Sequence, residues 1–176
     1  MKRNTAIGNF LETLCDDDQT QAYLTNSLQV ADVLEWILRQ FGEGCKVYLT
    51  TFSISEEFLR RLFFIEKEYK PAQFLLVLDL KATNKTLKLW PFIAQVIDEV
   101  YLADNHSKVL QVINPENGRR VSVVMSQNLT RGNRYESAII TTSWDVFATL
   151  RIQMEDLITN HSVPFNDVFA NKLRED

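Results

Sequence analysis

The stretch that decides the fold is His106-Ser107-Lys108-Val109-Leu110-Gln111-Val112, followed by the turn Asn114-Pro115-Glu116-Asn117-Gly118 and the return run Val121-Ser122-Val123-Val124-Met125-Ser126-Gln127-Asn128. The two runs are short and rich in valine, and the turn between them contains proline, asparagine and glycine. These features predict a β-hairpin. One of the two histidines in the chain opens the first run, and a lysine follows two residues later.

The hairpin predicts which side chains share a face. Because successive residues of a strand point to opposite faces, His106 and Lys108 share one face of the first strand, and Ser126 and Asn128 share one at the end of the second. All four meet if Lys108 lies opposite Ser126 and His106 lies opposite Asn128. This register needs a connection of five or seven residues, or a bulge, whereas a regular six-residue connection places the two pairs on opposite faces.

Together, these four side chains fit phosphoryl transfer. A lysine ammonium and an asparagine amide can hold anionic oxygens, and a histidine can act as a nucleophile or carry a proton near neutral pH. Glu136, which opens the next predicted strand, supplies a carboxylate that can fix the histidine tautomer. This chemistry requires no metal and no cofactor. Taken singly, each residue is more often a surface side chain or a turn former.

The rest of the chain alternates helices and strands. Apolar residues at helical spacing predict helices over residues 28–41, 55–69, 84–97 and 143–157. Short runs of β-formers predict strands over residues 46–52, 74–80, 99–103 and 137–142. This alternation implies a parallel core, to which the hairpin adds antiparallel strands. We therefore expect an α/β fold with a mixed β-sheet flanked by helices on both faces, in a single domain over residues 1–176 with its core at about 28–158.

The composition argues against several classes of protein. The 176 residues are 45% apolar and 24% charged, as in a globular domain, and no apolar run is long enough to cross a membrane. A net charge of -4 argues against a general nucleic-acid coat. Because the N-terminal residues lead into no long apolar region and Cys15 and Cys45 are far apart, we expect a cytoplasmic protein with reduced, buried thiols.

Charged residues gather at other places as well. Four arginines accompany the hairpin, namely Arg119, Arg120, Arg131 and Arg134. Each alone is more often a solvated turn residue, but their common position favours a polyanion, and Arg131 and Arg134 join Ser126 and Asn128 as substrate-binding candidates. The triplet Asp16-Asp17-Asp18 could bind a metal, although such runs are far more often solvated loops. We expect Asp79, at the end of a buried strand, to cap that strand rather than to face a ligand crevice.

The hairpin residues resemble the motif of the phospholipase D-like superfamily of phosphodiesterases and nucleases. That motif is His-x-Lys, four residues, an Asp, six residues, Gly-Ser, and an Asn two residues past the Ser. His106-Ser107-Lys108 matches its first part and Ser126-Gln127-Asn128 its second, while Glu136 matches the acidic residue that opens the following strand in the family's small nucleases. The order of elements over about residues 28–157 is also similar to one such module. The pattern departs at Ile113, in place of the Asp, and at Met125, in place of the Gly. The insert between the two halves, residues 114–120, is also slightly longer than in the motif.

The resemblance implies a metal-independent phosphodiesterase. In the family, two His-x-Lys motifs form one site, where one histidine attacks phosphorus to form a phosphohistidine and the other protonates the leaving oxygen. This chain has one motif, because His161 is followed by Ser162-Val163. The resemblance therefore implies a homodimer with two copies of His106 at a twofold axis, Lys108 and Asn128 holding the phosphate, and Glu136 orienting its own histidine. Nucleic acid is the implied substrate rather than lipid, because no basic amphipathic helix or anchor is found.

Two other functions fit the same residues. The first is a catalytically inactive module of this fold that binds nucleic acid or a protein, which Met125 favours because the motif glycine allows close approach at the site. The second is a domain whose partner enzyme or DNA-recognition module is a separate chain. The loss of the aspartate at Ile113 is interpreted as structural, because in the family that position lies at the end of the strand remote from the phosphate.

Overall fold

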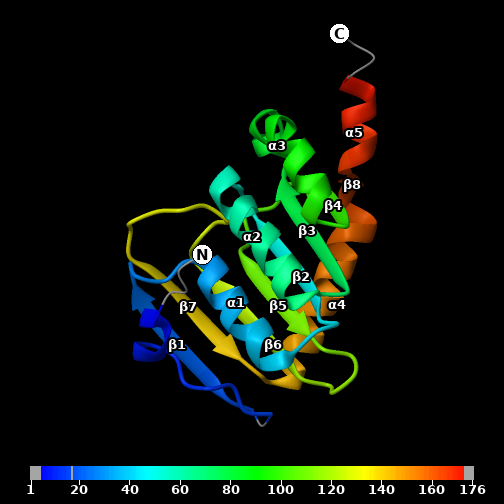
Figure 1. The fold of residues 1–176 in the computed structure, drawn as a ribbon. Coiled ribbons are helices and arrows are strands. Elements are labelled where there is room, and N and C mark those ends of the chain that lie inside the picture. The colour runs from blue at the N-terminus through cyan, green and yellow to red at the C-terminus, as the bar shows by residue number, and fades with distance from the viewer. Residues whose placement is uncertain (1–4, 17, 173–176) are drawn as a thin grey trace.

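The computed structural model describes residues 5–16 and 18–172. The first four residues and Asp17 of the acidic triplet, which entered the sequence predictions, lie outside the described residues, as do residues 173–176. An eight-stranded mixed sheet forms the centre of the molecule, with the strand order β1-β7-β6-β5-β2-β3-β4-β8 (Figure 1). The elements in chain order are η1 Thr5–Asn9, β1 Thr20–Thr25, α1 Val30–Phe41, β2 Lys46–Thr51, α2 Glu56–Tyr69, β3 Gln73–Asp79, η2 Leu80–Ala82, α3 Thr83–Val96, β4 Glu99–Ala103, β5 Val109–Ile113, β6 Arg120–Met125, β7 Glu136–Thr141, α4 Trp144–His161, β8 Ser162–Pro164 and α5 Phe165–Lys172.

The sheet has a parallel centre and antiparallel flanks. Strands β2, β3 and β4 run parallel, with α2 and α3 as the connections between them. On one side β5 pairs antiparallel with β2, and β6, β7 and β1 continue outward from it. On the other side β8 pairs antiparallel with β4. The predicted α/β fold with a mixed sheet is thereby confirmed.

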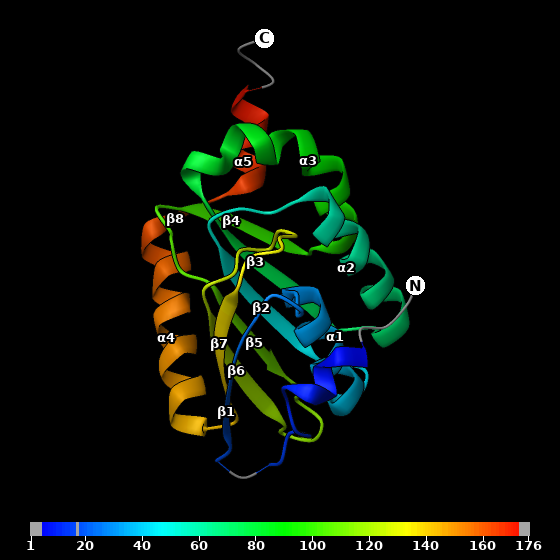
Figure 2. The ribbon, with the colours of Figure 1, turned by 90° about the vertical axis from the view of Figure 1, so that its left-hand side faces the viewer.

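Helices cover both faces of the sheet, as predicted. Figure 2 shows the sheet between α1 and α2 on one side and α4 on the other. Alternate residues of each strand serve the two sides, as the pleat requires. In β2, Val47 and Leu49 pack in the main core with residues of α1 and α2, whereas Tyr48 packs in a smaller cluster with Met154 of α4.

Most predicted elements are found close to their expected bounds. Helix α2 begins after Ser55, whose hydroxyl accepts the Phe58 N–H at 3.3 Å, as expected of a helix N-cap. Helix α1 ends at Gly42, where a φ of 87° breaks the helical conformation. Helix α3 contains Pro91 in its interior.

Two strands were not predicted, and both lie at sheet edges. In β1 only Tyr23 is an apolar residue of the core, and β8 is three residues long. An edge strand pairs with one neighbouring strand instead of two. These two strands carry little hydrophobic pattern, so only their pairing with that neighbour identifies them. The C-terminal segment docks on the domain through Phe165, which is fully buried and stacks on Trp90 with ring centroids 4.3 Å apart.

The predicted register of the hairpin is wrong. Ile113 pairs with Arg120, and the connection between β5 and β6 is a regular six-residue loop. Buried Asn114 fixes this loop to the end of α1, because its Nδ2 donates to the carbonyl oxygens of Phe41 at 2.8 Å and of Glu43 at 3.1 Å. Gly118 then closes the turn with a positive φ of 73°.

The observed register separates the residues that the hairpin was expected to join. Lys108 lies opposite Met125, whose N–H donates to the Lys108 carbonyl at 3.1 Å. Met125 packs in the main core on the α1 side, and its neighbour Ser126 is exposed on the α4 side. Lys108 and Ser126 therefore do not share a strand face, and the predicted pairing of His106 with Asn128 is not formed.

The two cysteines differ in their surroundings. Cys45 is buried, as expected, and burial raises the pKa of its thiol to about 11. Cys15 is exposed, so the expectation that both thiols are buried is wrong for this residue. In the part of the chain that the structure describes, no helix is long and apolar enough to cross a membrane.

Candidate active site

His106 and Lys108 contact each other in the segment that leads into β5. The Lys108 ammonium donates to the carbonyl oxygen of His106 at 2.7 Å, and its Nζ lies 3.3 Å from Nδ1 of the imidazole. The imidazole is exposed and the lysine is half-buried. A cation therefore lies beside an accessible imidazole, and this combination suits an anionic substrate oxygen.

The carboxyl end of β2 brings Asn128 to the same part of the molecule. Oδ1 of Asn128 accepts the Thr51 hydroxyl and the Phe52 N–H, both at 3.2 Å. The ring of Phe52 lies against the imidazole of His106, with centroids 5.3 Å apart. Phe52 therefore connects His106 to Asn128, although the two residues are not paired in the hairpin. Nδ2 of Asn128 has no protein partner among the described residues and can donate to a ligand.

A buried asparagine holds the peptide on both sides of His106. Asn105 is 4% exposed, and its Nδ2 donates to the carbonyl oxygens of Thr51 at 3.3 Å and of Val77 at 3.4 Å. Its Oδ1 accepts the backbone N–H of Ser107 at 3.0 Å and the Ser107 hydroxyl at 2.6 Å. The residues before and after the histidine are therefore fixed to the ends of β2 and β3.

Asp79 supports the same segment from the end of β3. Its carboxylate is buried and accepts the backbone N–H of Asn105 at 2.9 Å and of Lys81 at 2.8 Å. Both are bonds to backbone groups, as in a cap. The prediction that Asp79 caps its strand is confirmed.

The sequence predictions did not include Thr51, Phe52 or Asn105. A signal was present, because each is found where a buried strand ends, and the carboxyl ends of neighbouring parallel strands meet at one edge of the sheet. Asp79 occupies this edge at the end of β3, and Thr51 and Asn105 occupy it at the ends of β2 and β4.

Ser126 and Glu136 form a separate pair at the start of β7. The Ser126 hydroxyl donates to the Glu136 carboxylate and accepts the Ser137 N–H at 3.0 Å. Glu136 pairs with Thr25 of β1. Burial, followed by the negative charges of Glu136 and Asp32, raises the pKa of Tyr23 in the same strand to about 12. Over residues 5–16 and 18–172, no hydrogen bond joins Glu136 to His106. The contact in which Glu136 orients its own histidine is therefore not made in this structure.

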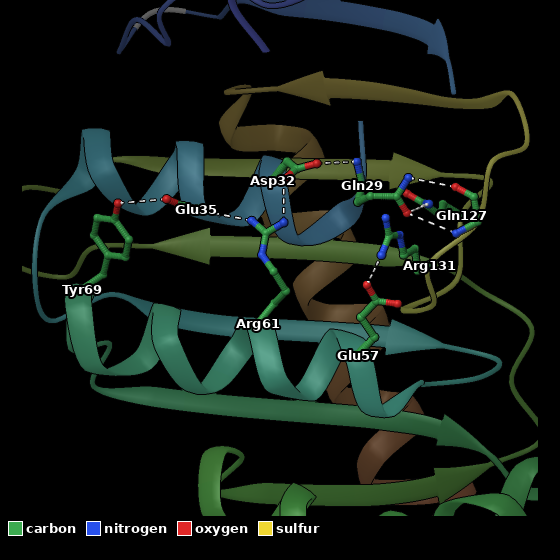
Figure 3. A network of polar contacts seen from close by, with 9 residues as sticks. Gln29, Asp32, Glu35, Glu57, Arg61, Tyr69, Gln127 and Arg131 are labelled. Atoms are coloured by element: carbon green, nitrogen blue, oxygen red, sulfur yellow. Dashed lines mark hydrogen bonds and ion pairs between the residues drawn. The ribbon is translucent and has the colours of Figure 1, made fainter. Parts of the chain in front are cut away.

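Polar contacts anchor the segment between β6 and β7 to the helices of the main core (Figure 3). Nε2 of Gln127 donates to Oε1 of Gln29 at 2.8 Å, just before α1. The Arg131 guanidinium pairs with Glu57 of α2 at 2.5 Å. Arg131 was predicted to bind substrate, and here its charge is partly neutralised by a carboxylate. Arg134 is exposed and has no ion pair among the described residues.

A cleft of about 610 Å³ lies between this segment and the N-terminal ends of α1 and α2. Arg61 of α2 crosses its floor and donates to Asp32 at 2.8 Å and to Glu35 at 3.0 Å (Figure 3). Arg131 and Glu57 form its rim. The acidic and basic groups of the cleft are paired, so the cleft presents no excess of positive charge for a polyanion.

Arg119 and Arg120 have structural contacts at the opposite end of β6. Arg119 donates to the carbonyl oxygens of Gln40 at 2.5 Å and of Leu14 at 2.9 Å and pairs with Asp16 at 2.8 Å. The guanidinium carbon of Arg120 lies 4.9 Å from the ring centroid of Trp144. At about 3.3 Å per residue, these two side chains begin roughly 20 Å from Ser126. They therefore belong to the hairpin turn rather than to the candidate site.

The acidic triplet shows no metal site in its described part. Asp16 pairs with Arg119, and Asp17 lies outside the described residues. Across residues 5–16 and 18–172, no group of three His, Cys, Asp or Glu side chains is placed to hold a metal ion.

The two departures from the phospholipase D motif lie in different surroundings. Ile113 ends β5, packs against the cluster under α4, and lies at the far end of that strand from His106. Met125 lies in the main core directly opposite Lys108. The position of Ile113 agrees with the structural interpretation of the lost aspartate, whereas Met125 is next to the candidate site.

Comparison with known proteins gives a clear answer for the fold. No protein-family model and no curated protein matches the sequence. Among solved structures, the chain is similar to Nuc from Salmonella typhimurium, a phospholipase D family member, with 15% identity and a TM-score of 0.60 over 84% of this chain and 98% of that one. NucT from Helicobacter pylori gives 12% identity and a TM-score of 0.58 over 82% and 98%. TrmBL2, an archaeal chromatin protein that binds DNA, gives 10% identity and a TM-score of 0.53 over 82% and 54%.

These likenesses cover nearly the full length of Nuc and NucT and more than four fifths of this chain. The sequence motif and the three-dimensional arrangement therefore agree on one architecture. The chain has the fold of the phospholipase D-like superfamily.

Proposed function

We propose that this protein is a metal-independent phosphodiesterase that cleaves nucleic acid at a site shared by two copies of the chain. The observation that carries the proposal is the contact between His106 and Lys108 beside Asn128, with Phe52 and Asn105 fixing all three at the carboxyl ends of buried strands. An exposed imidazole next to an ammonium and an amide donor suits attack on a phosphodiester.

In the proposed reaction, the neutral His106 imidazole of one subunit attacks phosphorus and forms a phosphorus–nitrogen bond. The bond from phosphorus to the leaving oxygen breaks, and the protonated imidazole of the partner subunit's His106 donates its proton to that oxygen. A water molecule then attacks phosphorus and gives a proton back to the partner's His106 as the phosphorus–nitrogen bond breaks. Both imidazoles return to their starting protonation states.

The other site residues have supporting roles in this proposal. Lys108 and the free Nδ2 of Asn128 hold the non-bridging phosphate oxygens. Glu136, already bonded to Ser126, meets an imidazole only when the second subunit is present, and Arg134 offers an unpaired cation to the polyanion. Likeness to Nuc and NucT supports a nucleic-acid substrate, and we place the dimer in the cytoplasm as a single-domain protein.

The decisive experiment measures cleavage of a chromogenic phosphodiester in EDTA by the parent chain and by His106→Ala. The parent is expected to turn over without added metal, and the variant is expected to be inactive. Because the imidazole is exposed, the variant should fold like the parent, which circular dichroism can check. Turnover that needs added metal, or that persists in His106→Ala, would reject the mechanism.

A second candidate function is a catalytically inactive module that binds nucleic acid. Met125 favours it, because a methionine stands opposite Lys108 where the motif has glycine, and TrmBL2 shows that a protein similar in fold can be a DNA-binding chromatin protein. Binding of labelled DNA by both the parent and His106→Ala, with no cleavage by either, would favour this candidate.

A further inference from the structure

Helices α2 and α3 lie side by side on one face of the sheet (Figures 1 and 2). Between them is a groove of about 290 Å³, which we call the α2–α3 groove. Both helices contribute apolar side chains to it, and the residues that matter here are Leu59, Phe63, Phe64, Phe92 and Val96, together with Arg60. None of them belongs to the candidate active site.

The α2–α3 groove combines a buried apolar floor with exposed aromatic rings. Leu59 and Val96 are buried, whereas Phe64 is 54% exposed on α2 and Phe92 is 43% exposed on α3. Phe63 meets Phe64 edge to face, with ring centroids 5.8 Å apart. Exposed aromatic rings around an apolar hollow are typical of a surface that receives the apolar side chains of another molecule.

Positively charged side chains border the groove. Nζ of Lys67 lies 4.4 Å from the centroid of the Phe63 ring, and Lys88 is exposed on α3 one helical turn before the phenylalanine of that helix. Neither lysine has an ion pair among the side chains that the structure describes. Arg60 is bonded to Glu56 of the same helix at 2.6 Å, so this pair adds no net charge. In a chain with a net charge of -4, this local positive excess favours an acidic partner.

The walls of the groove determine which conformation can occupy it. Both walls are helices, whose backbone groups are bonded within each helix, so an extended segment would find no backbone partners here. A helix satisfies its own backbone and presents side chains three and four residues apart to such a groove. Helix α5 is not this occupant, because its Phe165 stacks on Trp90 of α3 instead. Two copies of the groove facing each other would bring lysines against lysines, which disfavours self-pairing.

We propose that the α2–α3 groove binds an acidic amphipathic helix of a separate protein chain. The apolar stripe of that helix packs between Phe64 and Phe92, and carboxylates beside the stripe pair with Lys67 and Lys88. This binding surface goes beyond the proposed function and does not depend on it.

The test uses two fluorescent peptides of about four helical turns. One carries a stripe of leucines flanked by glutamates, and the other has lysine in place of every glutamate. Fluorescence anisotropy measures their binding to the full chain, which is expected to bind the acidic peptide at least about 10-fold more tightly than the basic one. Phe64→Glu and Phe92→Glu are each expected to raise the dissociation constant of the acidic peptide about 10-fold or more, because an aromatic contact is replaced by a carboxylate.

Matched controls place the binding at the groove. Ile152→Glu makes the same kind of change at a residue of α4 that is 66% exposed on the other face of the sheet, and it is expected to leave binding unchanged. Lys67→Glu is expected to weaken binding of the acidic peptide and to strengthen binding of the basic one. Arg39→Glu, at an exposed residue of α1, is expected to alter neither. Melting curves check that each variant folds.

The outcomes separate this inference from its rivals and from the proposed function. Failure of the acidic peptide to bind, equal affinity for the two peptides, or binding that survives both Phe64→Glu and Phe92→Glu overturns the inference. It is overturned as well if the parent binds phosphatidylglycerol vesicles but not the acidic peptide, and Phe64→Glu loses the vesicles. Phe92→Glu is expected to cleave the chromogenic phosphodiester as the parent does, so a failed groove leaves the enzyme standing, and an inactive parent leaves the groove standing.

Discussion

The ring of Phe52 packs against the imidazole of His106, with centroids 5.3 Å apart and ring planes tilted by 57°. The backbone N–H of the same residue donates to Asn128 at 3.2 Å. One residue at the end of β2 thus connects the two halves of the phospholipase D motif. The hairpin register was expected to join these halves. In the observed register, Lys108 and Ser126 lie on opposite faces of the sheet instead.

Replacing Phe52 should lower turnover without unfolding the protein. Phe52→Leu removes the flat surface behind the His106 imidazole, and we expect kcat for phosphodiester cleavage to fall about 10-fold to 100-fold because the reacting group is less well placed. Phe52→Tyr keeps the ring and should keep most of the activity. Steady-state kinetics test this, and a change confined to KM in Phe52→Leu would contradict a positioning role.

Asn105 should be important for both stability and activity. Asn105→Ala removes the buried amide that bonds to Thr51 and Val77 and leaves their carbonyl oxygens without that donor, so we expect the free energy of unfolding to fall by about 1–3 kcal/mol. Turnover should fall further than this loss of stability explains. Asn166→Ala, at an exposed asparagine of α5, is the matched control. Urea denaturation and kinetics measure the two effects, and equal stability of the two variants would contradict the prediction.

Gly118 should be required for the six-residue connection of the hairpin. A β-carbon there meets no atom within 4 Å, but the φ of 73° strains any L-residue, so Gly118→Ala should destabilise the protein by about 1–2 kcal/mol. Gly132→Ala is the control, because Gly132 has the same open surroundings without the positive φ. It should be neutral or slightly stabilising. Comparable denaturation midpoints for the two alanine variants would show that the turn adopts another conformation.

Arg60 and Arg61 are neighbours in α2 but should differ sharply in their effect on stability. Arg61→Ala leaves the buried carboxylate of Asp32 without its cation, and we expect a loss of about 3 kcal/mol. Arg60→Ala removes an exposed pair with Glu56 and should cost less than about 0.5 kcal/mol. Thermal and urea unfolding of the two variants provide the measurement. A similar loss in both would mean that Asp32 finds another partner.

The sequence by itself determined the local elements and their order. The stripe of apolar residues in α1, the serine before α2 and the short runs of β-formers each depend on neighbours within a few residues, and such patterns persist whatever the rest of the chain does. The same holds for the His-x-Lys and Ser-x-Asn pairs, whose spacing was enough to indicate a phospholipase D-like fold. The edge strand β1 was not predicted, because it has little apolar pattern of its own and is defined by its pairing with β7.

Only the tertiary structure decided how the halves of the motif meet. The register depends on Asn114 reaching carbonyl groups at the end of α1, some seventy residues away in the chain. The place of Asn128 depends on a hydrogen bond to β2, and the partial neutralisation of Arg131 depends on Glu57 of α2. Each is a long-range contact of a polar side chain, whose energy depends on a partner that no local pattern specifies.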